Sequence, residues 1–199
     1  MKSRTAGSAT NARCAWCAGV PELIAYHDEE WGVPEYDDQR LFEKICLEVF
    51  QCGLSWRTVL AKRENFRRAF CDFDFYQIAD FGPSEVQRLL ANSGLIRHRG
   101  KIEAVIHNAA RAQELVLEQG SLAAFIWQYQ PDPRSLPAPQ SITMSPESIA
   151  LSRDLKRRGW KFVGPTTLFA LMQAMGLIND HEVGCFRRSL IPDAGQSPL

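Results

Sequence analysis

The chain has 199 residues, of which 45% are hydrophobic and 23% are charged, and its formal net charge at pH 7 is +0, from 23 basic and 23 acidic side chains. This length and composition fit one globular domain, or two interlocked lobes, with a sizeable core. The balanced charge excludes a global field that attracts polyanions, so any contact with nucleic acid must come from local basic patches.

Two further classes of protein are disfavoured by the pattern of apolar residues. No apolar run is long enough to span a bilayer, and residues 1–11 lack the apolar stretch of a signal peptide. Six cysteines without a secretion signal indicate metal-bound or free thiols in a reducing compartment rather than a disulfide framework. We therefore expect a cytoplasmic protein that makes no contact with membranes.

Helical periodicity runs through almost the whole sequence. One helix follows a cap at Asp37 or Asp38 and ends near Gly53, with an apolar stripe along one face. Further helices are predicted to begin near Ser55, Gly82, Gly100, Leu122, Ser145 and Pro165. No segment alternates as a strand does, so the sequence predicts an all-α fold.

Cysteine and histidine residues near the two ends suggest a metal site. Two thiolates and two neutral imidazoles, from Cys14, His27, His181 and Cys185, form a complete tetrahedral shell for Zn²⁺ that is typical of structural sites. The spacing of four predicts that His181 and Cys185 lie above one another on a helix face. Because Cys14 and Cys17 also resemble half of a zinc knuckle, Cys17 competes with His27 as a ligand. The alternative is a scatter of buried thiols and surface histidines.

Glu48 and a group of aromatic residues are the next candidates. Glu48 lies at the edge of its helix's apolar stripe, where it is either an ordinary exposed glutamate or a carboxylate held in a low-dielectric pocket. Aromatic side chains usually fill a core, but parallel aromatic faces also hold an extruded nucleobase. The candidates of this kind are Trp16, Tyr26, Trp31 and Trp56.

The segment from Gly94 to Lys101 connects two predicted helices through a glycine-flanked turn, as in a helix-hairpin-helix motif. Glycine lets the backbone approach a phosphate closely, and the free N–H groups that begin the second helix favour an anion. Arg97, Arg99 and Lys101 add positive charge. The alternative is a solvated basic turn without a ligand.

Several long segments of the sequence resemble one family, 3-methyladenine DNA glycosylase I of bacteria. Residues 25–34 (AYHDEEWGVP) are similar to its signature, and further segments match in the same order: ICLE at 45–48, GLSW at 53–56, KREN at 62–65, GLIRHRGKI at 94–102, FVGPT at 162–166 and NDH at 179–181. The resemblance extends from about Arg13 to Cys185.

The resemblance implies an all-α fold of the helix-hairpin-helix glycosylase superfamily, with a zinc site joining the N- and C-terminal segments. It favours His27 over Cys17 as a zinc ligand. The positions that match the family's site residues imply their roles. Glu48 and Tyr26 are expected to form hydrogen bonds with the damaged base, Trp56 to stack on it, and Trp16 and Trp31 to line the pocket. Leu54 matches the residue that wedges into the DNA stack, and the hairpin residues Gly94, Arg97, Arg99, Gly100 and Lys101 contact DNA.

Two features depart from the patterns of the superfamily and the family. Many superfamily members carry a catalytic aspartate soon after the hairpin, whereas residues 102–112 contain none, as in the family's own exception. Val49 and Phe50 stand where the resemblance leads us to expect smaller or more polar residues, which predicts a different pocket rim.

The resemblance implies a monofunctional glycosylase that hydrolyses the N-glycosidic bond of 3-methyladenine, or of 3-methylguanine, in alkylated double-stranded DNA, without lyase activity. We expect a monomer, associated with the nucleoid and without an obligate protein partner. The expected organisation is a flexible leader at 1–12, one domain of two lobes at 13–189 and a flexible tail at 190–199. The alternatives are a non-catalytic zinc-stabilised protein that binds damaged or bent DNA and, with less support, a zinc hydrolase, which needs an open metal position.

Overall fold

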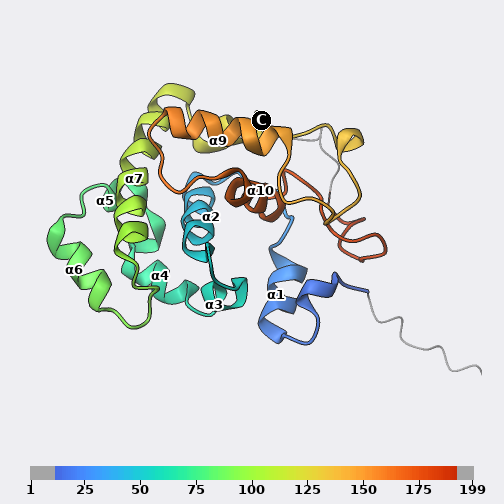
Figure 1. Cartoon of the computed structure of the whole chain (residues 1–199), viewed down its shortest axis with the longest axis horizontal. Helices are drawn as coiled ribbons and strands as arrows, with labels where there is room; N and C mark the ends of the chain where they lie inside the picture. Colours follow the sequence, from blue (N-terminus) through green and yellow to red (C-terminus); the bar gives the residue numbers. More distant parts are fainter. Residues whose placement is uncertain (1–11, 192–199) are drawn as a thin grey trace, which may run out of the picture.

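The computed structural model describes residues 12–191, and all regular elements in this range are helices (Figure 1). They are η1 (Ala15–Cys17), α1 (Pro21–Glu29), α2 (Asp38–Gln51), α3 (Trp56–Leu60), α4 (Arg63–Ala69), η2 (Cys71–Phe73), α5 (Phe75–Ile78), α6 (Pro83–Ala91), α7 (Arg99–Gln119), α8 (Leu122–Trp127), η3 (Pro133–Ser135), α9 (Pro146–Arg157) and α10 (Pro165–Ala174). The all-α prediction is therefore confirmed. The predicted flexible leader and most of the predicted tail lie outside the described residues, and the domain boundaries stay predictions.

Helix α2 lies at the centre of the molecule. Every residue from 41 to 50 is buried, and the helix packs against α3, α7, α8 and α10. The Asp37 carboxylate accepts the N–H of Arg40 at 2.9 Å and is the N-cap, whereas Asp38 accepts the N–H of Ala123 at the start of α8. The two aspartates thus start α2 and attach α8 to it.

The predicted helix starts are confirmed, but three helices were not predicted. Ser55 caps α3 by accepting the N–H of Thr58, and Ser145 caps α9 in the same way. Helix α1 was missed because it has no continuous apolar stripe: only Tyr26 and His27 are buried along its nine residues. Helices α4 and α5 were missed because they are short, at seven and four residues.

The prediction that His181 and Cys185 share a helix face is wrong. Helix α10 ends at Ala174, Gly176 follows with φ of +78°, and the chain then runs through successive turns to residue 191. Gly184, between the pair, has φ of +96°, which no right-handed helix accommodates. A turn in which the Cys185 N–H donates to the Glu182 carbonyl brings the two side chains together instead.

The N-terminal segment lies against the C-terminal one, as Figure 1 shows for the blue and red parts of the ribbon. The N–H of Phe186 donates to the carbonyl of Ala12, and the N–H of Gly32 donates to the carbonyl of Ala174. Gly176 makes this junction tight, because a Cβ placed on it would lie 2.5 Å from the Pro34 nitrogen. Residues 12–36 are thus held by the chain after α10.

None of the helices described between residues 12 and 191 is both long enough and apolar enough to cross a membrane. All six cysteines fall in this range, and all are free thiols.

The junction generates a stability prediction for Gly176→Ala. The new methyl group meets the Pro34 backbone, and alanine is strained at this positive φ, so we expect the free energy of unfolding to fall by about 2–4 kcal/mol. Gly120→Ala is the matched control: its φ is +87°, but its Cβ would meet nothing within 4 Å. The control isolates the backbone strain, which is about 1–2 kcal/mol. Urea unfolding with equal losses in both variants would show that the close approach is unimportant.

Candidate functional site

A cavity of about 440 Å³ lies between α1, α2, α3 and α10, a volume typical of small-molecule sites. Its lining comprises the predicted residues Trp16, Tyr26, Trp31, Glu48 and Trp56, together with Lys44, Gln51, Gln140, Ile142, Thr143, Thr166, Phe169, Ala170 and Gln173. The structure therefore gathers every base-contacting candidate of the sequence around one space.

The aromatic rings of the cavity are inclined to one another. Trp16 and Trp31 meet edge to face with centroids 5.1 Å apart, and Tyr26 and Trp56 are 5.2 Å apart at an interplanar angle of 47°. These two pairs of rings are therefore not parallel to each other in the protein without a base. The indole N–H groups of Trp16 and Trp56 are buried without a hydrogen-bond partner among residues 12–191.

Glu48 is a buried carboxylate and not a surface residue. Only 5% of it is exposed, and Lys44, one helical turn earlier, places its ammonium 2.9 Å from Glu48 Oε1. The same ammonium donates to the Tyr26 hydroxyl at 2.7 Å and lies 3.5 Å from the centre of the Trp56 ring. One cation thus touches three of the predicted site residues.

Burial changes the ionisation of this group of side chains. It raises the pKa of Tyr26 well above its usual range, so the phenol keeps its proton at neutral pH. It lowers the pKa of Lys44, while the neighbouring Glu48 carboxylate opposes that change. Removing either member of the Lys44–Glu48 pair would leave a buried charge without a partner, which is strongly destabilising.

Lys44 was not identified from the sequence, although a signal was present. Lysine and glutamate four residues apart lie on the same helix face, so Lys44 could have been paired with Glu48 from spacing alone. Gln140, Thr143 and Gln173 could not have been found this way, since their approach to α2 depends on the tertiary fold.

The predicted effect of Val49 and Phe50 on the pocket rim is wrong. Both side chains are fully buried, and Phe50 packs on Phe66 with ring centroids 4.4 Å apart. They lie on the part of α2 that faces the core rather than the cavity, whose lining from α2 is Lys44, Glu48 and Gln51.

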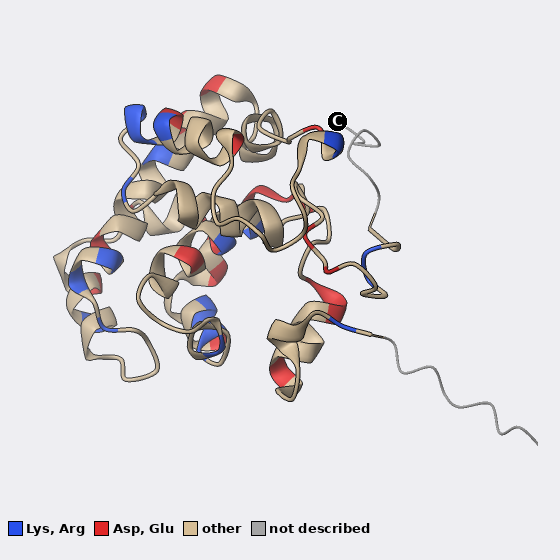
Figure 2. Ribbon diagram, turned by 45° about the vertical axis from the view of Figure 1, so that its right-hand side comes forward, with Lys and Arg blue, Asp and Glu red and all other residues tan. Residues whose placement is uncertain are grey.

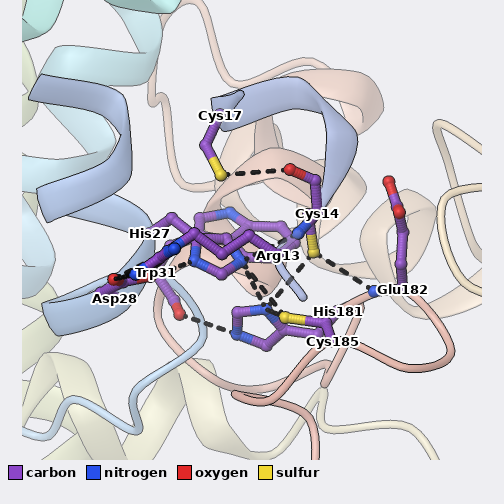
Figure 3. A network of polar contacts seen from close by, with 9 residues as sticks. All are labelled: Arg13, Cys14, Cys17, His27, Asp28, Trp31, His181, Glu182 and Cys185. Atoms are coloured by element: carbon purple, nitrogen blue, oxygen red, sulfur yellow. Dashed lines mark hydrogen bonds and ion pairs between the residues drawn. The ribbon is translucent and has the colours of Figure 1, made fainter. Parts of the chain in front are cut away.

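The four predicted metal ligands converge at the junction of the chain ends (Figure 3). Their donor atoms lie within 4.8 Å of one another, and all four residues are buried. The Nδ1 atom of His181 lies 3.2 Å from His27 Nε2, 3.5 Å from Cys14 Sγ and 3.6 Å from Cys185 Sγ. Donors bound at about 2.0 Å (nitrogen) and 2.3 Å (sulfur) around a tetrahedral ion lie roughly 3.3–3.8 Å apart. The distances from His181 Nδ1 agree with this range, and the four residues together could hold a metal ion once the more widely spaced donors close in.

Outer contacts orient these ligands. His27 Nδ1 contacts the Asp28 carboxylate at 2.8 Å, and His181 Nε2 contacts the Trp31 carbonyl at 3.1 Å, which leaves Nε2 of His27 and Nδ1 of His181 facing the cluster. Cys17 points elsewhere: its thiol donates to the Cys14 carbonyl at 3.1 Å (Figure 3). The geometry thus agrees with His27, and not Cys17, as the fourth ligand.

Burial also sets the proton affinities of the cluster. It raises the pKa of Cys14 to about 12 and lowers that of His181 to about 4, with the neighbouring His27 acting in the same direction on His181. The imidazole is therefore neutral, as a ligand must be, and a bound cation would stabilise the thiolate that burial disfavours.

The predicted hairpin is the turn between α6 and α7. Arg97 and Arg99 are exposed, and Arg99 pairs with Glu103 at 3.2 Å. Lys101 differs from the expectation of an outward charge: it is buried, and its ammonium donates to the carbonyls of Phe50 and Cys52 at the end of α2. His98 accepts the Lys101 N–H and caps α7, so this backbone donor is also occupied.

Leu54 lies between α2 and α3 and is 42% exposed. Gly53 precedes it with φ of +84°, which turns the chain outward after α2. Gly94 packs against Asn65 of α4, and Gly100 against His98.

The basic residues of the chain are interspersed with acidic ones over the helices (Figure 2), which agrees with the balanced net charge.

Comparisons with known proteins establish the family of this chain. The family model described as methyladenine glycosylase matches residues 16–188. The chain belongs to this family. It is 48% identical over 177 residues to DNA-3-methyladenine glycosylase 1 of Escherichia coli, covering 87% of this chain and 95% of that protein. It is 46% identical to DNA-3-methyladenine glycosylase of Haemophilus influenzae, covering 87% of this chain and 96% of that protein.

Solved structures of the family have the same fold. A crystal structure of 3-methyladenine DNA glycosylase I, 48% identical, superposes with a TM-score of 0.81 over 88% of this chain and 98% of that one. The enzyme from Staphylococcus aureus, whose structure concerns 3-methyladenine recognition, is 33% identical, with a TM-score of 0.81 over 88% and 96% of the two chains. The family resemblance inferred from the sequence is thus confirmed.

Proposed function

We propose that this protein is a base-excision repair glycosylase that hydrolyses the N-glycosidic bond of 3-methyladenine in alkylated DNA. The observation that carries the proposal is the cavity that joins the buried Glu48 to Tyr26 and three tryptophans. The family supports the enzyme over a non-catalytic DNA-binding protein, because its members are named for this activity. A zinc hydrolase is disfavoured, since four protein ligands fill a tetrahedral shell.

The substrate's charge explains why no aspartate is needed after the hairpin. Adenine methylated at N3 is a cation, and the electron pair of its glycosidic bond neutralises it as the bond breaks. Departure of a neutral base needs little acid catalysis, so selective binding can supply much of the rate and specificity. Water then adds to C1′ of the sugar and loses a proton.

The cavity residues match the demands of a flipped cationic purine. Glu48 accepts hydrogen bonds from the edge of the base, the protonated Tyr26 hydroxyl donates or accepts there, and Trp56 stacks on the ring. Trp16 and Trp31 form the walls, and their π faces favour a cationic ring over a neutral one. We include 3-methylguanine as a second substrate of the same charge.

The proposal is for a monofunctional enzyme. Lyase chemistry requires a free amine that attacks C1′ of the sugar. The two buried lysines of α2 and α7 are engaged: Lys44 with Glu48 and Tyr26, and Lys101 with two carbonyls of α2. We also propose that the protein acts on duplex DNA as a monomer.

The Cys14, His27, His181 and Cys185 cluster is proposed to hold one structural Zn²⁺. Two thiolates and two imidazoles are ligands that zinc favours, and all four donor atoms already lie within 4.8 Å of one another. A closed shell supplies no open position for a substrate, so the ion's contribution is to keep the two chain ends together.

Contact with DNA is assigned to the α6–α7 turn and to Leu54. Gly94 and Gly100 let the backbone approach a phosphate, Arg97 and Arg99 supply exposed charge, and Leu54 fills the space left by the flipped base. Lys101 contributes from inside, by fixing the start of α7 to the end of α2, next to Leu54.

Product analysis tests the activity. Purified protein incubated with methylated duplex DNA should release 3-methyladenine, identified by chromatography, and the strands should stay intact until hot alkali cleaves the abasic sites. Release of no methylated base would refute the proposed function. Strand cleavage without alkali would refute only its monofunctional part.

Glu48→Gln tests the carboxylate. The variant keeps the shape and one acceptor but loses the charge, so excision of 3-methyladenine should fall by about 10- to 100-fold, a transition-state loss of roughly 1.4–2.8 kcal/mol. Binding to undamaged duplex should change little. Single-turnover excision assays measure the effect, and activity equal to the parent would remove Glu48 from the mechanism.

Metal analysis of cysteine variants tests the zinc site. The parent should contain one zinc per chain, and Cys185→Ser should lose most of it and unfold at lower denaturant concentration. Cys17→Ser is the matched control, since this buried thiol lies three residues from Cys14 but points away from the cluster. Zinc lost equally from both variants would contradict the assigned ligands.

Salt titration tests the phosphate contacts. Arg99→Ala should weaken binding to all duplex sequences alike and reduce the slope of log affinity against log salt by about one. Arg134→Ala removes an exposed guanidinium from η3, on the other side of the molecule (Figure 1), and should leave both unchanged. An altered preference among undamaged sequences in Arg99→Ala would contradict contact through phosphate.

A further inference from the structure

The ammonium of Lys44 makes the three contacts that the proposed function assigns to the base. It pairs with Glu48 at 2.9 Å, donates to the Tyr26 hydroxyl at 2.7 Å and lies 3.5 Å above the centre of the Trp56 ring. Stacked atoms in van der Waals contact are about 3.5–4.0 Å apart. The ammonium therefore stands where a ring stacked on this face of Trp56 would lie, and the two cannot occupy this face together.

A second cavity, of about 250 Å³, offers the ammonium another position. Lys44, Tyr26 and Trp56 line both cavities, so Lys44 stands in the wall between them. The second cavity is strongly charged, with Glu29, Glu30, Glu35 and Glu43 against Arg40, Arg63 and Arg67. Four carboxylates face three guanidinium groups there, so an arriving ammonium balances the charge.

We propose that Lys44 is an intramolecular competitor of the damaged base. Its ammonium pairs with Glu48 in the free enzyme, moves into the second cavity when a cationic base enters, and returns to expel the base after cleavage. This inference rests on the proposed function and adds a residue that controls capture and release.

Charge balance explains why such a competitor suits this reaction. The substrate base is a cation, so it replaces the ammonium as the partner of Glu48 and the buried carboxylate stays paired. After the glycosidic bond breaks, the base holds the electron pair and is neutral. A neutral base leaves Glu48 without a counter-ion, which is costly in a buried site, and the return of the ammonium removes that cost. An undamaged purine is neutral too and meets the same competition.

Lys44→Met tests the proposal, because methionine fills a similar volume without the charge. The free 3-methyladenine base should bind this variant at least tenfold more tightly than the parent, as measured by quenching of tryptophan emission. In multiple-turnover excision the variant should release product in a burst during the first turnover and then continue at a steady rate below the parent's. Lys44→Gln, which is polar but uncharged, should shift both readouts in the same direction.

Two controls make the outcomes distinct. Lys156→Met makes the same exchange on the exposed side of α9, away from both cavities, and should bind the free base as the parent does. Circular dichroism and thermal unfolding establish that each variant is folded. Equal or weaker binding of the free base by folded Lys44→Met and Lys44→Gln would overturn the competitor role. If the parent itself released no 3-methyladenine from DNA, the proposed function would fail instead.

Discussion

The site depends on the junction between the two ends of the chain. Residues 12–36 carry Trp16, Tyr26 and Trp31, three of the aromatic side chains of the cavity, but they contain only short helices with little apolar surface of their own. What holds them against α2 and α10 is the convergence of Cys14 and His27 with His181 and Cys185, aided by the backbone bonds of Gly32 and Glu35 to the end of α10. The junction therefore places the wall of the cavity that Trp16, Tyr26 and Trp31 form opposite Glu48.

The second constraint is the charge that α2 buries. Its cavity face carries Lys44 and Glu48, both buried, where each charge requires the other. A pocket that admits a cation must therefore exchange it for the cation already present. Such a pocket discriminates by charge as well as by shape, which suits a lesion that differs from adenine by one methyl group and one positive charge.

Sequence patterns predicted the helices with clear caps and stripes, such as α2, α7 and α9, because these signals are local. They also pointed to Glu48 and the metal ligands, although only the family resemblance favoured His27 over Cys17. The misses have tertiary causes. His181 and Cys185 meet through turns that the spacing of four did not reveal, and Lys101 turns inward because the carbonyls at the end of α2 accept its ammonium. Gln140 and Gln173 reach the cavity only through the packing of α10 and the loop before α9.

Hydrogen–deuterium exchange before and after treatment with a chelator, which would remove the proposed zinc ion, tests most directly whether the terminal junction holds the aromatic wall of the pocket in place. If the junction holds this wall, amides of α1 and of residues 177–191 should lose protection together on chelation, while those of α5, α6 and α7 should keep theirs. An even loss over all helices, or no change in α1, would contradict it.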